Sequence, residues 1–202
     1  MLPAVRIDHR PVALTAVPGG LLLGFLDFVW IKWVPYPFAE LGNSTATWAV
    51  AAFAFGWWLR SGPVRAALGA AVLLVVAVPS YYLTATLLQG DDLAVLWAPT
   101  SLLWMAFGVL AGIVFGTGGT WARLPGPRRI VGTALPAAVF FEEAARFASR
   151  PGAAWNVAID VALGVLAVVL VGRSNRQRAL ALAVAVPVAA VIFVGFALAA
   201  GF

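Results

Sequence analysis

Three side chains that can do chemistry stand close together in one stretch of this sequence. Arg146 comes four residues after Glu142 and three after Glu143, so a helix would place all three near one face. A protonated carboxyl group can donate a proton, and an ionised one can hold a cation. One arginine leaves these two acids with surplus negative charge, and Asp27 and Asp160 add to that surplus.

The composition shows what surrounds these acids. Of the 202 residues, 63% are hydrophobic and only 10% are charged, and the mean hydropathy is +0.97. Soluble domains carry about 25% charged residues, so this balance excludes a soluble enzyme, a nucleic-acid binder and a disordered tail. The net charge of +5 comes with arginines that sit in short loops between apolar runs. The chain is therefore expected to be an integral membrane protein.

Seven apolar runs have about the length of a membrane span. A bilayer core of about 30 Å needs roughly 17 to 25 apolar residues, and lipid forces such a segment to be helical. The second run is short and the fifth carries the acids, so these two runs are the least typical of membrane spans. We expect an all-α, polytopic transmembrane bundle that forms one domain over residues 1–202. The predicted spans are 12–34, 44–60, 64–88, 94–117, 129–149, 154–172 and 178–201.

Loop charge orients these spans. Arginines gather in the N-terminal tail and in every second loop, as the positive-inside rule requires for an inner N-terminus and an outer C-terminus. We expect a multi-pass protein of the bacterial cytoplasmic membrane. The arginines concerned are Arg6, Arg10, Arg60, Arg65, Arg123, Arg128, Arg129, Arg173, Arg176 and Arg178.

With this topology, the polar residues of several spans fall in the outer leaflet. An acid inside a bilayer costs roughly 2.5–3.5 kcal/mol, and it usually faces water or a partner. We therefore predict an outward-facing polar cavity. The alternative is that residues near helix ends, such as Asn156, Asp160, Arg146 and Arg150, simply reach the headgroups. The candidate ligand-binding residues are Asp27, Asn43, Tyr81, Tyr82, Trp104, Glu142, Glu143, Arg146 and Asp160.

Several kinds of site have no counterpart in the sequence. Cysteine is absent and the one histidine, His9, lies in the N-terminal tail, which excludes thiolate chemistry and histidine-based metal sites or triads. No phosphate loop, HExxH or GxSxG motif occurs. We expect neither a metal nor a cofactor.

Small residues recur at every fourth position in two spans. Gly108, Gly112 and Gly116 form such a stripe, and Ala16, Gly20 and Gly24 form another. A face without side chains lets another helix backbone come close. The simplest interpretation is packing inside the chain, and the alternative is a face for a second copy or a partner subunit.

One set of small, polar and aromatic positions is spread over most of the chain. It comprises Asn43-Ser44 with Trp48, Phe55-Gly56, Tyr81-Tyr82, Trp97 with Pro99, Phe115-Gly116-x-x-Gly119 with Trp121, and Phe141-Glu142. This set resembles a family of small actinobacterial integral-membrane proteins that is classed only as a domain of unknown function. The resemblance covers roughly residues 20–180 and implies no activity.

Three functions remain open from the sequence. The first is a membrane protein that binds or translocates a small molecule or a cation in the polar cavity. The second is an intramembrane enzyme, similar to a terpene cyclase, in which Glu142 or Glu143 is the catalytic general acid on a lipid or isoprenoid. The third is a non-catalytic scaffold that packs partners through its glycine stripes. Membrane lipid is the expected surrounding in each case.

Overall fold

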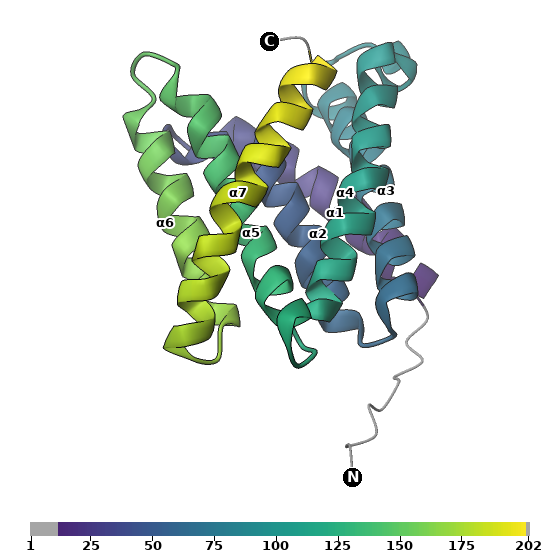
Figure 1. Cartoon of the computed structure of the whole chain (residues 1–202). Helices are drawn as coiled ribbons and strands as arrows, with labels where there is room; N and C mark the ends of the chain where they lie inside the picture. Colours follow the sequence, from purple (N-terminus) through teal and green to yellow (C-terminus); the bar gives the residue numbers. More distant parts are fainter. Residues whose placement is uncertain (1–11, 201–202) are drawn as a thin grey trace. The chain divides into compact units, whose positions relative to one another are not determined.

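The computed structural model describes residues 12–200, and every regular element in that range is helical. Arg6 and Arg10, on which part of the topology prediction rests, lie outside the described residues, and so does His9. The elements are α1 (Val12–Trp33), η1 (Phe38–Leu41), α2 (Thr45–Leu59), α3 (Pro63–Gln89), η2 (Leu93–Trp97), α4 (Pro99–Trp121), α5 (Pro127–Ala148), α6 (Ala154–Val171) and α7 (Asn175–Ala200), where η marks a short 3₁₀ helix (Figure 1).

Each predicted apolar run coincides with one of the seven α-helices. Five of these helices, α1, α3, α4, α6 and α7, are long and apolar enough to cross a membrane. α2 has 15 residues and is therefore only ~22 Å long at 1.5 Å per residue. α5 is the helix that carries Glu142, Glu143 and Arg146. Length and composition thus make the chain a multi-pass membrane protein.

The largest shift from the predicted bounds is at the start of α4. The apolar pattern predicts that this helix begins at residue 94, but residues 93–97 form η2. Asp92 caps the first turn of η2 by accepting a 2.8 Å hydrogen bond from the Ala94 N–H. Pro99 then begins α4. A proline fixes its own φ angle and needs no hydrogen-bond acceptor for its nitrogen, so it favours the first position of a helix.

The chain divides into two compact units. Unit 1 comprises Met1–Trp30 and Ala51–Thr120, and unit 2 comprises Ile31–Val50 and Trp121–Phe202. The boundary passes through α2, whose first turns belong to unit 2 and whose later turns belong to unit 1. The expectation of one domain over residues 1–202 stays a prediction.

In unit 1, the glycine stripes of α1 and α4 lie against α3. A Cβ atom on Gly112 would come within 2.3 Å of the Ala71 backbone, and one on Gly24 within 2.1 Å of the Ala77 carbonyl oxygen. These contacts leave no room for a side chain, so backbones approach directly as small residues allow in membranes. The stripes are thus occupied inside the chain, and their use by a second copy or a partner stays a prediction.

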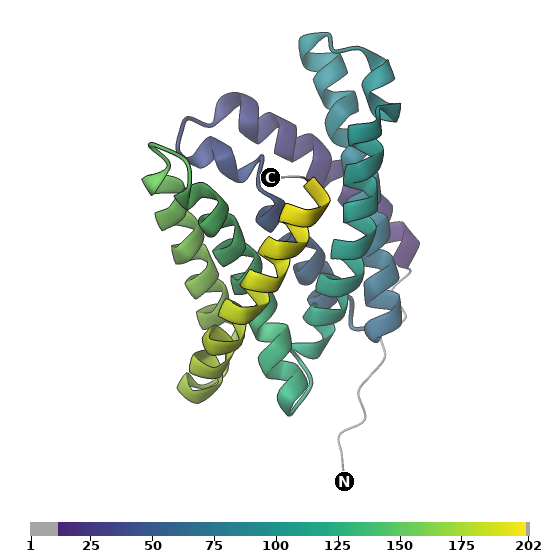
Figure 2. The same cartoon turned by 45° about the horizontal axis from the view of Figure 1, so that its top comes forward.

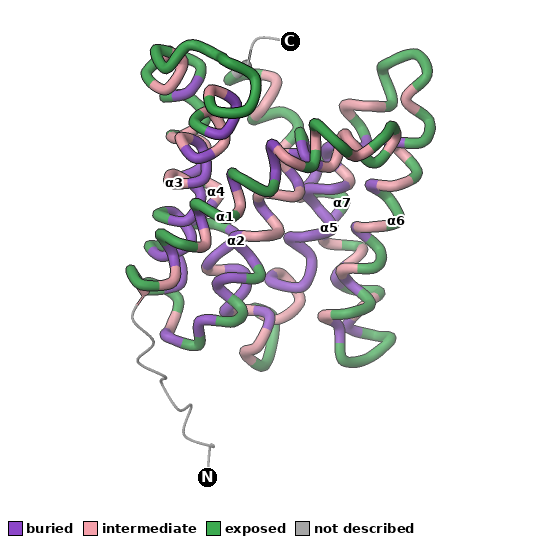
Figure 3. Tube along the Cα trace, turned by 180° about the vertical axis from the view of Figure 1, so that it is seen from behind, coloured by how far each residue is buried: buried purple, intermediate pink, exposed green. Residues whose placement is uncertain are grey.

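Unit 2 is arranged around α5. Both cartoon views show α5, α6 and α7 side by side (Figures 1 and 2), and most of the middle of α5 is buried (Figure 3). The core between these helices consists mainly of small residues that permit close packing. Its buried members are Ala134, Ala137, Ala138, Val168, Ala181, Ala185 and Ala189.

Candidate functional site

The acids of α5 are buried in unit 2. Glu142 is 0% exposed and Glu143 is 3% exposed. α5 can carry them because its neighbours cover it, so the carboxylates meet protein groups rather than lipid. The predicted placement of Glu142, Glu143 and Arg146 near one helix face agrees with the contacts that follow.

Arg146 forms a bidentate ion pair with Glu142. Its Nε donates to Glu142 Oε1 at 2.6 Å and its Nη2 donates to Oε2 at 3.3 Å. Nη2 also donates to the Thr45 hydroxyl at 2.7 Å, and the guanidinium lies 4.9 Å from the centre of the Phe196 ring. Paired donors on a planar group fit a carboxylate closely, so Glu142 is fully engaged by Arg146.

Glu143 caps the first turn of α2. Its Oε2 accepts from the Ser44 hydroxyl at 2.7 Å and from the Ala46 backbone N–H at 2.9 Å. The Ser44 oxygen in turn accepts from the Thr47 N–H at 3.0 Å. The first N–H groups of a helix lack partners within it and form its positive end. An ionised Glu143 therefore finds compensation there and from Arg146, whose Nη2 is 3.7 Å from Oε1.

Asp160 is the acidic residue that takes no part in the hydrogen bonds and ion pairs described above. It lies on the buried stripe of α6, which also contains Asn156, Gly164 and Val168. The residue is 3% exposed, and its Oδ2 atom is buried without a hydrogen-bond partner in the described structure. The charged groups that act on it electrostatically are Glu143, Arg146 and Glu142 on α5. Three carboxyl groups thus share one guanidinium.

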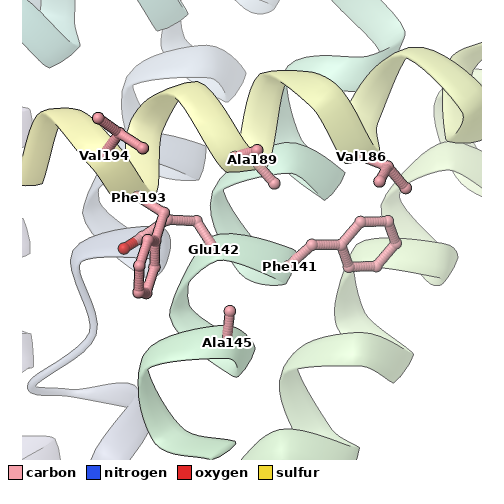
Figure 4. A pocket seen from close by; sticks show the side chains of 8 residues that line it. Phe141, Glu142, Ala145, Val186, Ala189, Phe193 and Val194 are labelled. Atoms are coloured by element: carbon pink, nitrogen blue, oxygen red, sulfur yellow. The ribbon is translucent and has the colours of Figure 1, made fainter.

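An apolar pocket borders this network between α5 and α7. Its volume is about 370 Å³, and Glu142 is the only charged residue of its wall (Figure 4). The walls come from both helices, so a guest here would meet hydrocarbon side chains and one carboxylate that is already paired. The lining residues are Phe141, Glu142, Ala145, Val186, Ala189, Ala190, Phe193 and Val194.

The remaining predicted site residues lie elsewhere. Asp27, Tyr81, Tyr82 and Trp104 belong to unit 1. There Asp27 is 7% exposed and lies close enough to Tyr81 to interact with it electrostatically. The Tyr81 ring contacts Phe28 and Tyr82, at centroid distances of 5.5 Å and 5.2 Å. Asn43 is exposed just before α2. The structure therefore brings together Glu142, Glu143, Arg146 and Asp160 of the predicted set.

Sequence reasoning did not assign Ser44, Thr45 or Tyr36 to the site. Ser44 and Thr45 stand at the start of the apolar run 44–60, where serine and threonine commonly cap a helix. This signal predicts the cap but not its partner on α5. Tyr36 lies before η1, and its hydroxyl is 3.1 Å from Asn156 Oδ1. No local spacing indicates that contact.

Replacing Ser44 with alanine should destabilise the chain by about 0.5–2 kcal/mol, the usual cost of losing a helix cap. The change removes the acceptor for the Thr47 N–H and one donor to Glu143. Thermal unfolding in detergent, followed by circular dichroism, measures the loss. The matched control is Asn43→Ala, because Asn43 is exposed and such substitutions usually stay within about 0.5 kcal/mol. Equal melting of the two variants would contradict the capping role.

Comparison with known proteins identifies a family and no function. No curated protein and no solved structure matches the chain. The model of a family of unknown function, DUF6518, matches residues 5–202. This match confirms the expectation of an uncharacterised family. Because it covers nearly the whole chain, the protein belongs to the DUF6518 family of unknown function.

Proposed function

We propose that this membrane protein binds a cation at the acid cluster of unit 2, and that the cation is a proton carried by Asp160. The observation that carries the proposal is the buried Oδ2 atom of Asp160, which has no hydrogen-bond partner in the described structure. A buried polar atom without a partner is costly, and the cost is larger for a charged group. A proton or another cation on this carboxyl neutralises the charge and so lowers that cost.

The distribution of charge favours Asp160 over the two glutamates. Glu142 is paired with Arg146, and Glu143 is compensated by the first turn of α2. A third negative charge in the same low-dielectric region has only the shared Arg146 guanidinium to compensate it, and like charges nearby disfavour it. Asp160 is therefore the group that gains most from a bound cation.

The described residues also favour a proton over a divalent metal. They contain no group of three or more metal-ligating side chains close enough to hold a metal ion. A proton needs one oxygen only, whereas divalent ions take several oxygen ligands. In this proposal the chain lies in the bacterial cytoplasmic membrane with its N-terminus inside and its C-terminus outside, and the carboxyl group loads from the outer side.

Carbodiimide labelling tests the proposal. Dicyclohexylcarbodiimide adds to protonated carboxyl groups in apolar surroundings, so the purified chain in detergent should gain one adduct that peptide mapping assigns to Asp160. Labelling should fall as the pH rises, because only the protonated acid reacts. Asp160→Asn should abolish the adduct, while Asp92→Asn at the exposed position before η2 should leave it unchanged.

Two outcomes would contradict the proposal. The wild-type chain could take up no label in acidic buffer, or the Asp160→Asn variant could label as strongly as the wild type. Proteoliposomes that enclose a pH-sensitive dye extend the test from binding to translocation. If the bound proton crosses the membrane, proton flux into these vesicles should disappear in Asp160→Asn and persist in Asp92→Asn.

A second candidate function rests on the pocket between α5 and α7. Its apolar walls suit part of a lipid or isoprenoid chain, which supports an intramembrane enzyme with Glu142 at the pocket wall. Against this, both oxygens of Glu142 accept from Arg146, which suits an ion pair better than a general acid. Glu142→Gln should abolish product formation if this alternative holds, while the lipid substrate still binds.

A further inference from the structure

We propose that Tyr36 and Asn156 form a polar gate that controls how water reaches the Asp160 carboxyl. This inference rests on the proposed function, because it assumes that Asp160 exchanges a proton. Asn156 stands one helical turn before Asp160 on α6, and both residues lie on the same buried stripe. Four residues of helix rise by about 6 Å, so the two side chains follow one another along that face.

Tyr36 connects this stripe to the surface. Its hydroxyl lies 3.1 Å from both Asn156 Oδ1 and the Gly152 carbonyl oxygen, and donates its one proton between them. Tyr36 is 55% exposed, whereas Asn156 is 4% exposed. The tyrosine hydroxyl therefore occupies the position at which a water molecule would otherwise approach the Asn156 side chain.

In the opposite direction, the buried stripe of α6 contains no further polar residue. After Asp160 the buried residues of α6 are Gly164 and Val168, and the space beside Gly164 is filled by the Phe141 ring, 2.7 Å from where a Cβ would stand. On α5, the charged groups that act on Asp160 electrostatically are Glu143, Arg146 and Glu142. A proton that arrives from water along α6 must therefore pass Asn156 before it reaches Asp160, and the Tyr36 hydroxyl covers the outer side of Asn156.

The gate makes Tyr36 a positioning residue that sets the rate of exchange. Removing its hydroxyl leaves Asn156 Oδ1 open to water but leaves Asp160 and the charged residues of α5 unchanged. We expect Tyr36→Phe to accelerate proton exchange at Asp160 about 2- to 10-fold, as the loss of one neutral hydrogen bond implies. Asn156→Leu should slow it, because an apolar side chain then separates Asp160 from the surface.

Infrared spectroscopy after transfer into D₂O measures this rate directly. The band of a protonated carboxyl group shifts when deuterium replaces the proton, and the Asp160 band is the one that is missing from Asp160→Asn. The Tyr82→Phe variant is the matched control, since it removes a tyrosine hydroxyl in unit 1. We expect wild-type exchange in this control, faster exchange in Tyr36→Phe and slower exchange in Asn156→Leu.

The outcomes separate the gate from the proposed function. If no carboxyl band depends on Asp160, the proposed function fails. If the band is present but Tyr36→Phe leaves its exchange rate unchanged, the gate is wrong and the proton site stands. Backbone amide exchange shows whether the Tyr36→Phe variant opens more readily as a whole. Equal acceleration of amide and carboxyl exchange in this variant would also overturn the gate.

Discussion

Replacing Arg146 with methionine should be the most damaging single charge change in this protein, with an expected loss of about 3–5 kcal/mol of folding free energy. The side chain is the guanidinium that pairs with Glu142 and approaches Glu143. Without it, two buried carboxylates remain close together with no nearby cation. Thermal unfolding and the recovery of folded protein in detergent measure the effect.

Two further variants make this prediction specific. Arg150→Met removes a guanidinium that lies 5.1 Å from the centre of the Phe147 ring at an exposed position, and it should cost much less. The double variant Arg146→Met with Glu142→Met should recover part of the stability, because it removes the pair rather than one partner. If Arg146→Met melts like Arg150→Met, the ion pair contributes little and the charge argument fails.

Gly112→Leu should prevent stable packing of α4 on α3. A Cβ at this position would be 2.3 Å from the Ala71 backbone, and backbone cannot move aside as a flexible side chain can. Overpacking of a core costs about 1–3 kcal/mol when only side chains must adjust, so a backbone clash should exceed that range. We expect loss of monodisperse protein in size-exclusion chromatography and a large drop in melting temperature.

The matched control for this variant is Gly195→Leu. An added Cβ at Gly195 meets no heavy atom within 4 Å, so the same change in size should be tolerated there. A result in which Gly112→Leu folds normally but loses association with a second copy would instead favour the glycine stripe as an interface between chains.

Much of the fold follows from the apolar pattern because lipid leaves few alternatives. A long apolar run in a bilayer must satisfy its own backbone hydrogen bonds, and only a helix does this within one segment. The predicted runs 12–34 and 154–172 therefore lie within one residue of α1 and α6 at each end. The start of α4 departs from this pattern. Hydropathy alone predicts that the span begins at residue 94, but Asp92 caps the short helix η2 and Pro99 begins α4 after it.

In the candidate site too, the sequence predicts the contacts within one helix but not the contacts between helices. The pairing of Glu142 with Arg146 follows from helical spacing, because residues four apart are neighbours on one face. The hydrogen bonds from Ser44 and Ala46 to Glu143 join residues 99 and 97 positions apart, and no periodicity indicates them. Asp27 satisfies the same sequence criteria as Asp160, yet it belongs to unit 1.

The sequence by itself thus determined that the chain is helical, where its helices lie and which side chains are too polar for lipid. Only the tertiary structure decided that Glu143 is the cap of α2 and that Asp160 is left with an unpaired oxygen. The physical reason is that hydrophobicity and helical period act along the chain, whereas compensation of a buried charge depends on which donors other helices bring within about 3 Å.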